Sequence, residues 1–203
     1  MKPLAIRSAA ALALVVCVGA GSGCNVRAPL QLDEEFASAG VEKILLLPVI
    51  DARPDRLDYV VLSRNVADAT ARMLRAKGYL IAESDTYQQR PVGPIDIDTV
   101  QAETVVGLAP PEARDFLIVQ VERMDRSIDE LGASYSVRLS GLLVDRDGGR
   151  VLWRDSASAA NNLTGVFTVM SHGSSQYEAA INASRALFET LPRRAGAEKD
   201  KKR

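Results

Sequence analysis

The chain has 203 residues, of which 47% are hydrophobic and 25% charged, and its formal net charge is −1. These values are typical of one globular domain with short appendages. The near-balance of 25 basic and 26 acidic residues excludes the broad positive field that nucleic-acid binding requires.

The first 23 residues predict an export signal. Lys2 and Arg7 give a positively charged start, and Ala9–Ala20 is a run of apolar or small residues. This run is shorter than the ~20 residues that a membrane-spanning helix needs, and it is typical of a signal peptide. The alternative is a buried N-terminal helix, which the glycine-rich residues 19–23 disfavour because glycine weakens helices.

Export leaves a single cysteine at the start of the mature chain. The two cysteines are Cys17, inside the signal, and Cys24, just after it. One cysteine forms neither an intramolecular disulfide nor a zinc cluster, and we expect no metal and no cofactor.

The residues Ser22-Gly23-Cys24 resemble the lipobox of bacterial lipoproteins, although Gly21 stands where an aliphatic residue is usual. The resemblance implies that Cys24 carries acyl chains, which anchor the protein to a membrane with its domain facing the periplasm. Asn25, in place of aspartate, implies the outer membrane. The alternative is ordinary cleavage after Ser22, which leaves Cys24 as a free thiol.

Hydrophobic periodicity predicts a tether at 24–40, an α/β domain at 41–191 and a disordered charged tail at 192–203. The domain is expected to hold a mixed sheet of about five strands in the order β-α-β-(α)-β-β-β-α, an α/β (α+β) arrangement with helices packed on the sheet. The expected strands are 43–49, 79–82, 115–122, 134–145 and 150–155, and the expected helices are 58–77, 96–106 and 176–191.

Local signals support these elements. Gly78 is placed to end the first helix, and its crossover favours parallel pairing of the flanking strands. Between 134 and 145, Tyr135, Val137, Leu139, Gly141 and Leu143 alternate with polar residues, which indicates a half-exposed antiparallel strand within a meander. Residues 160–175 read as a loop or a short extra hairpin.

Several motifs together resemble a family of periplasmic lipoprotein domains. They are Leu47-Pro48-Val49, Lys77-Gly78-Tyr79, the strand Asp115–Val121 and the hairpin Leu142–Trp153. They are similar to domains of the curli-secretion lipoprotein, the TolB N-terminal domain and the lipoprotein activators of penicillin-binding proteins. Those proteins are not known as enzymes, so the resemblance implies an accessory or scaffold role in envelope assembly or transport.

The sequence shows little that suggests catalysis. The sole histidine, His172, lies among serines, but no Gly-x-Ser-x-Gly elbow accompanies it, so a hydrolase triad is disfavoured. Residues Asp145–Gly148 lack the further ligands of a calcium loop, and we expect a hairpin turn there. We therefore expect no catalytic residue and no enzyme.

The apolar segment after the meander is the expected partner contact: Val166, Phe167, Val169 and Met170. Packing of this segment into its own core is the alternative. The expected partners are the membrane, through the N-terminal lipid, and an envelope protein. A homo-oligomer, including a subunit of an outer-membrane export complex, stays open.

Overall fold

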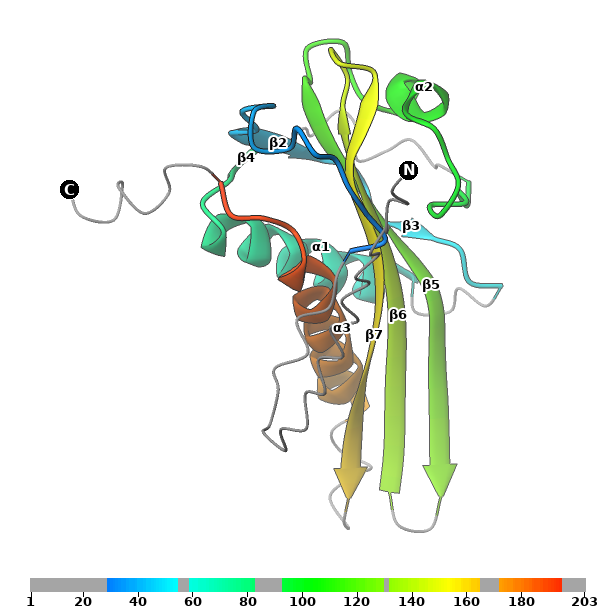
Figure 1. Ribbon diagram of the computed structural model, residues 1–203. Coiled ribbons are helices and arrows are strands. Elements are labelled where there is room, and N and C mark those ends of the chain that lie inside the picture. Colours follow the sequence, from blue (N-terminus) through cyan, green and yellow to red (C-terminus); the bar gives the residue numbers. More distant parts are fainter. Residues whose placement is uncertain (1–28, 55–58, 83–92, 130–131, 165–171, 195–203) are drawn as a thin grey trace, which may run out of the picture.

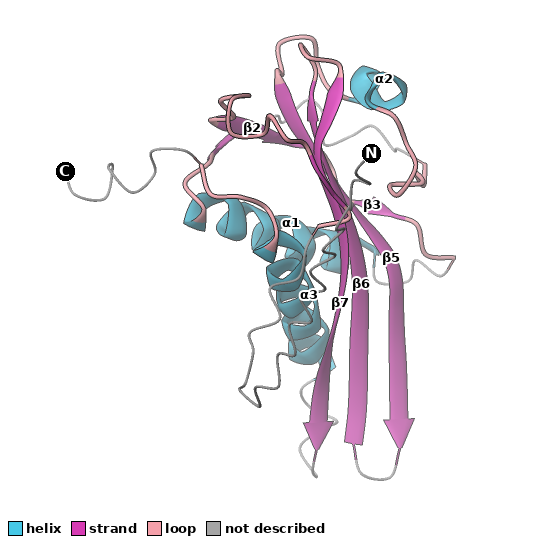
Figure 2. Ribbon diagram, viewed as in Figure 1, coloured by secondary structure: helices cyan, strands magenta, loops and turns pink. Residues whose placement is uncertain are grey.

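The computed structural model describes residues 29–54, 59–82, 93–129, 132–164 and 172–194. Within them, seven strands form one mixed sheet with helices packed against it, which confirms the predicted α/β class (Figures 1 and 2). The strand order is β1-β7-β6-β5-β2-β4, and β3 pairs with β5 beside this path. The strands are β1 (Gln31–Leu32), β2 (Lys43–Leu46), β3 (Ile50–Asp51), β4 (Leu80–Ala82), β5 (Asp115–Asp129), β6 (Gly132–Asp145) and β7 (Arg150–Thr164). The helices are α1 (Tyr59–Ala76), α2 (Ala102–Val105) and α3 (His172–Glu189), and a 3₁₀ helix, η2 (Val106–Leu108), follows α2.

The parallel half of the sheet follows from the β-α-β pattern. Strand β2 pairs in parallel with both β4 and β5, and α1 makes the crossover between β2 and β4. Gly78 ends this connection with a φ of 91°, a left-handed conformation that favours glycine. The buried face of α1 includes Leu62, Val66 and Leu74, whereas Ala76 at its end is exposed.

Pro48 divides the first apolar run into β2 and β3. Both pieces pair with β5, and the Leu47 amide still donates to the Leu117 carbonyl at 3.0 Å. Proline has no amide hydrogen to donate, so the regular ladder stops at residue 48 and resumes at Ile50.

The segment 24–40, expected as a tether, contributes to the fold in its second half. Strand β1 pairs antiparallel with β7, and the following turn buries Phe36 and Ala39 against the core. The expectation that folding begins at residue 41 is therefore wrong. Phe36 is the reason, because burying its ring outweighs the polar character of its neighbours.

The largest difference from expectation is the length of the meander. Strands β5, β6 and β7 contain 15, 14 and 15 residues. Strands β5 and β7 run well beyond the ends expected from hydrophobic patterning, whereas β6 nearly matches the expected 134–145. Strand β7 continues through Thr164, and α3 already begins at His172. The expectation of a loop or extra hairpin at 160–175 is therefore wrong for residues 160–164 and 172–175. Residues 165–171 lie outside the described residues.

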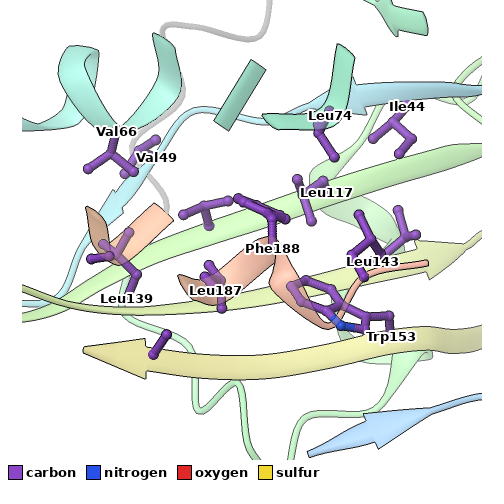
Figure 3. Packing of buried hydrophobic residues seen from close by; sticks show 14 of the residues in the cluster. Ile44, Val49, Val66, Leu74, Leu117, Leu139, Leu143, Trp153, Leu187 and Phe188 are labelled. Atoms are coloured by element: carbon purple, nitrogen blue, oxygen red, sulfur yellow. The ribbon is translucent and has the colours of Figure 1, made fainter. Parts of the chain in front are cut away.

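The main core lies between the sheet and helices α1 and α3 (Figure 3). Trp153 is fully buried and stacks on Phe188, with ring centroids 5.6 Å apart. Its indole Nε1 donates to the Thr190 hydroxyl at 3.1 Å, and that hydroxyl donates to the Asp155 carboxylate at 2.7 Å. These bonds fix the end of α3 on β7 and satisfy a buried carboxylate.

A second, smaller core covers the opposite face of the sheet, but only in its upper half. There Phe116, Ile118 and Leu142 pack against residues of the 95–113 segment, which includes α2 (Figure 1). Main-chain carbonyls of this segment accept hydrogen bonds from Arg154 and Arg146, which reach across from the sheet. This cover also buries Ser140, which the alternation had assigned to an exposed face.

Candidate docking surface

The half of the meander that contains residues 123–129 of β5, 132–138 of β6 and 156–164 of β7 is called the distal half here, and one of its faces is covered. Helix α3 packs along β6 and β7, whereas α2 lies beside the other end of the strands (Figures 1 and 2). A register shift between Val121 and Arg123 separates the two halves of β5. The face opposite α3 is therefore left without a covering layer in the described part of the chain, and we call its distal portion the distal polar face. Its side chains belong to Glu122, Arg123, Asp125, Ser127, Ser134, Ser136, Arg138, Ser156, Ser158 and Ala160.

The charges of the distal polar face are matched within the face itself. Arg138 donates to the Glu122 carboxylate at 2.8 Å, and Arg123 donates to the Asp125 carboxylate at 2.8 Å. A further bond joins the Ser136 hydroxyl to Asp125 at 3.4 Å. Such exposed ion pairs contribute little to stability, so their main effect is to leave a flat, hydrated and nearly neutral surface.

Two strand edges border this face. On β7, pairing with β1 ends at Arg154, the partner of Gln31. Two observations explain why it ends there. Pro29 would align with Ser156 in the same register but has no amide hydrogen, and the Ser156 amide already donates to the Asp155 carboxylate at 2.7 Å. The outer edge of β7 beyond Ser156 has no paired strand among the described residues.

The outer edge of β5 loses its neighbouring strand at the same level of the sheet. Strand β3 ends at Asp51, whose buried carboxylate forms an ion pair with Arg53 at 2.7 Å. The Ala52 amide donates to the Val121 carbonyl at 3.0 Å. Beyond that bond the described residues add no further strand to β5. Both edges present unpaired main-chain groups, which are a template for pairing with another chain.

A cavity of about 490 Å³ lies at the opposite end of the sheet. Its lining includes Glu42, Lys43, Glu112, Arg114 and Asp115. Burial raises the pKa of Asp115 to about 6; Arg114 opposes this rise, and two neighbouring aspartates, at 145 and 147, add to it. One Asp115 oxygen, Oδ1, is buried without a hydrogen-bond partner. Asp115 shares the strand parity of Leu117, which belongs to the main core, and it also borders this cavity, to which we assign no ligand.

A second cavity, of about 580 Å³, separates the β1 edge from α2 and is lined mainly by polar side chains. Arg154 forms part of its wall and donates to the carbonyls of Ile97, at 3.0 Å, and Val100, at 2.8 Å. These bonds hold the 95–101 loop on the sheet. The carboxylates of Asp33, Asp98 and Glu103 surround the opening, so the cavity offers an anion no net attraction.

Most residues singled out from the sequence fall outside the described part of the chain. These are Cys24 and the expected partner contacts Val166, Phe167, Val169 and Met170. His172 is the first residue of α3, but its side chain is also outside that part. Asp145–Gly148 forms the expected turn, in which the Gly148 amide donates to the Asp145 carboxylate at 3.0 Å.

Hydrophobic patterning does not reveal the distal polar face and its edges. Residues 156–164 read Ser-Ala-Ser-Ala-Ala-Asn-Asn-Leu-Thr, which has no strong apolar alternation. The only signal that could have extended the strand is the pairing of this segment with β6, which a single sequence does not display.

The described residues also bear on two other classes of site. They contain no group of three or more His, Cys, Asp and Glu side chains placed to hold a metal ion. None of the helices they form combines the length and apolar character needed to cross a membrane.

Comparisons with known proteins add resemblances of fold. No protein-family model matches the sequence, and neither does a curated protein. Among solved structures, lipoprotein GNA1162 of Neisseria meningitidis is 22% identical with a TM-score of 0.45, over 70% of this chain and 96% of that one. The PelC dodecamer of Paraburkholderia phytofirmans is 17% identical with a TM-score of 0.42, over 76% and 90%. A minor lipoprotein of Acinetobacter baumannii is 12% identical with a TM-score of 0.37, over 71% and 87%. These structural neighbours include bacterial lipoproteins, but the values are too low to establish a shared family or function.

Proposed function

We propose that the mature chain is a lipid-anchored periplasmic lipoprotein that acts without catalysis, as an accessory or scaffold component of an envelope assembly or transport system. One observation carries the docking role: among the described residues, nothing covers one face of the distal half of the meander or pairs with its two outer edges (Figure 1). A sheet that served only to hold a core would gain nothing from extending bare strands into solvent, since edges invite association.

The anchor in this proposal is Cys24, with acyl chains that hold the protein at the outer membrane. Each buried CH₂ contributes about 0.8 kcal/mol, so several chains give stable attachment. From Cys24 to the start of β1 at Gln31, the chain spans at most about 24 Å when fully extended. The folded domain would therefore lie close to the bilayer, within reach of other envelope proteins.

The anchoring half is tested by fractionation. Cys24→Ser should move the protein from the membrane to the soluble fraction, because it removes the acylated thiol. Cys17→Ser, inside the predicted signal, is the matched control and should leave the distribution unchanged. Membrane association of Cys24→Ser equal to that of the control would refute the anchor.

The docking half is tested by photo-crosslinking in cells, followed by mass spectrometry. A photoreactive residue placed at Ser136 or Ser158, on the distal polar face, should capture envelope proteins. The same residue at Arg64, exposed on α1, is the control and should capture few. Equal capture from both surfaces, or none from either, would contradict a docking role for the distal meander. The apolar segment 166–170, which follows β7 in the sequence, remains part of this proposal as a second contact.

A further inference from the structure

The two open edges of the meander differ in charge. Along β5, the edge carries Glu122, Arg123, Asp125 and Arg126. Along β7, residues 156–164 include no charged residue and no proline. Proteins commonly protect exposed edges from pairing with charges, prolines or bulges. The β7 edge has none of these devices over this stretch, and its register with β6 is unbroken from Thr164 to Trp153.

The main chain of β7 presents a regular set of outward hydrogen-bonding groups. The Asp33 amide donates to the Leu152 carbonyl at 2.9 Å, which in the β1–β7 register makes Gln31 and Arg154 a hydrogen-bonded pair, so Arg154 directs its main chain away from β6. Amide and carbonyl directions alternate along an antiparallel strand, and Ser158, Ala160, Asn162 and Thr164 therefore share this outward direction. Ser156 does too, but its amide is taken by Asp155.

We propose that a second copy of this chain occupies the β7 edge, with the two β7 strands pairing antiparallel about a two-fold axis. The inference rests on the proposed docking role and names the occupant of one of its edges. A two-fold axis brings each residue opposite one from the same segment, so a charged edge risks like-charge contacts. The neutral segment 156–164 avoids them. Pairing from Ser158 to Thr164 would form about eight main-chain hydrogen bonds.

The side chains along this edge favour a second copy over an unrelated extended peptide. Ser158 and Ala160 are small and exposed, so they allow close approach of an identical strand. Recognition of a peptide at a sheet edge takes its specificity from pockets for alternate side chains. Neither the 490 Å³ cavity nor the 580 Å³ cavity is lined by a β7 residue beyond Arg154.

Disulfide trapping in cells tests the geometry of the pair. Pairing from Ser158 to Thr164 places the two-fold axis at Asn161, so single cysteines are introduced at Ala160, Asn161 or Asn162 in the full-length chain, and mild oxidation is followed by non-reducing electrophoresis. Bridged residues need Cα atoms about 4.4–6.8 Å apart, so a cysteine near the two-fold axis should give a product of twice the mass. Arg126→Cys, on the β5 edge, should give none. A product from the β5 cysteine alone would overturn the inference.

Edge-blocking variants test whether the pairing holds the dimer in detergent extracts, measured by light scattering. Ser158→Pro removes an outward amide and leaves the β6 ladder intact, so the twice-mass species should be lost while circular dichroism stays unchanged. Ala160→Lys places like charges near the axis and should act in the same direction. Arg126→Pro is the control and should stay dimeric.

The outcomes separate this inference from the docking role. A wild-type chain that is monomeric at every concentration, but is still crosslinked to envelope proteins from Ser158, overturns the second copy and keeps the docking role. A dimer that survives both Ser158→Pro and Ala160→Lys also overturns it. Self-crosslinks from Asn161→Cys, together with loss of the dimer in Ser158→Pro, support it.

Discussion

Gly141 lies directly against the buried Trp153, and its replacement by alanine should destabilise the fold. A Cβ at this position would lie 2.9 Å from Cζ3 and 3.0 Å from Cη2 of Trp153, and 3.3 Å from Cδ2 of Leu187. Trp153 has little freedom to move away, because its ring stacks on Phe188 and its Nε1 is hydrogen-bonded to Thr190.

The expected size of the effect follows from overpacking. Forcing an extra methyl group into a packed core costs about 1–3 kcal/mol, and a Gly→Ala change offsets about 0.4–1 kcal/mol of this by restricting the unfolded chain. We expect Gly141→Ala to lower the free energy of unfolding by about 1–2 kcal/mol. For a domain of this size, that corresponds to a fall in Tm of about 2–8 °C.

Urea unfolding followed by the fluorescence of Trp153, the single tryptophan, measures the change directly. Gly107→Ala is the matched control, since no heavy atom lies within 4 Å of its Cβ position and its φ is not positive. The control should be neutral or slightly stabilising. If Gly141→Ala were as stable as Gly107→Ala, the packing of β6 against Trp153 described here would be wrong.

Three further predictions concern buried groups. Leu139→Asp places an unpaired carboxylate where the side chain is fully buried, so it should unfold the domain; a native circular dichroism spectrum would show that Leu139 faces solvent. The raised pKa of Asp115, about 6 against 3.8, means that the folded state holds this proton more tightly than the unfolded chain. The stability that this tighter proton binding gives the wild type should therefore be lost as the pH rises from about 4 to 6. Over that range the urea midpoint of Asp115→Asn should rise relative to that of the wild type. A difference between the two midpoints that stays constant with pH would contradict the raised pKa of Asp115. Arg154→Met removes the donors to the carbonyls of Ile97 and Val100, and the unsatisfied carbonyls should lower the free energy of unfolding by about 2–4 kcal/mol. Hydrogen exchange should become faster in the 95–113 segment alone; a uniform increase across the chain would refute local detachment of this segment.

Strong local signals determined much of the fold. The apolar run before Pro48, the helical repeat ending at Gly78 and the turn at Asp145–Gly148 each depend on residues close together in sequence. Each of these elements lies where its pattern predicts, within a few residues. The alternation from Tyr135 to Leu143 also identified the buried face of this strand, since Tyr135, Leu139 and Leu143 are fully buried.

The export signal and the cysteine that would carry the anchor stay predictions from the sequence by itself, because both are read from linear order. Only the tertiary structure decided how far β5 and β7 extend, since residues 123–129 and 156–164 are charged or small and become strands through pairing with β6. It also decided that the 24–40 segment joins the core through Phe36, and that Arg146 and Arg154 fasten a cover over half of the second face. Hydrogen bonds between distant segments have no period along the chain, so hydrophobic patterning could not have revealed the open edges on which the proposed docking depends.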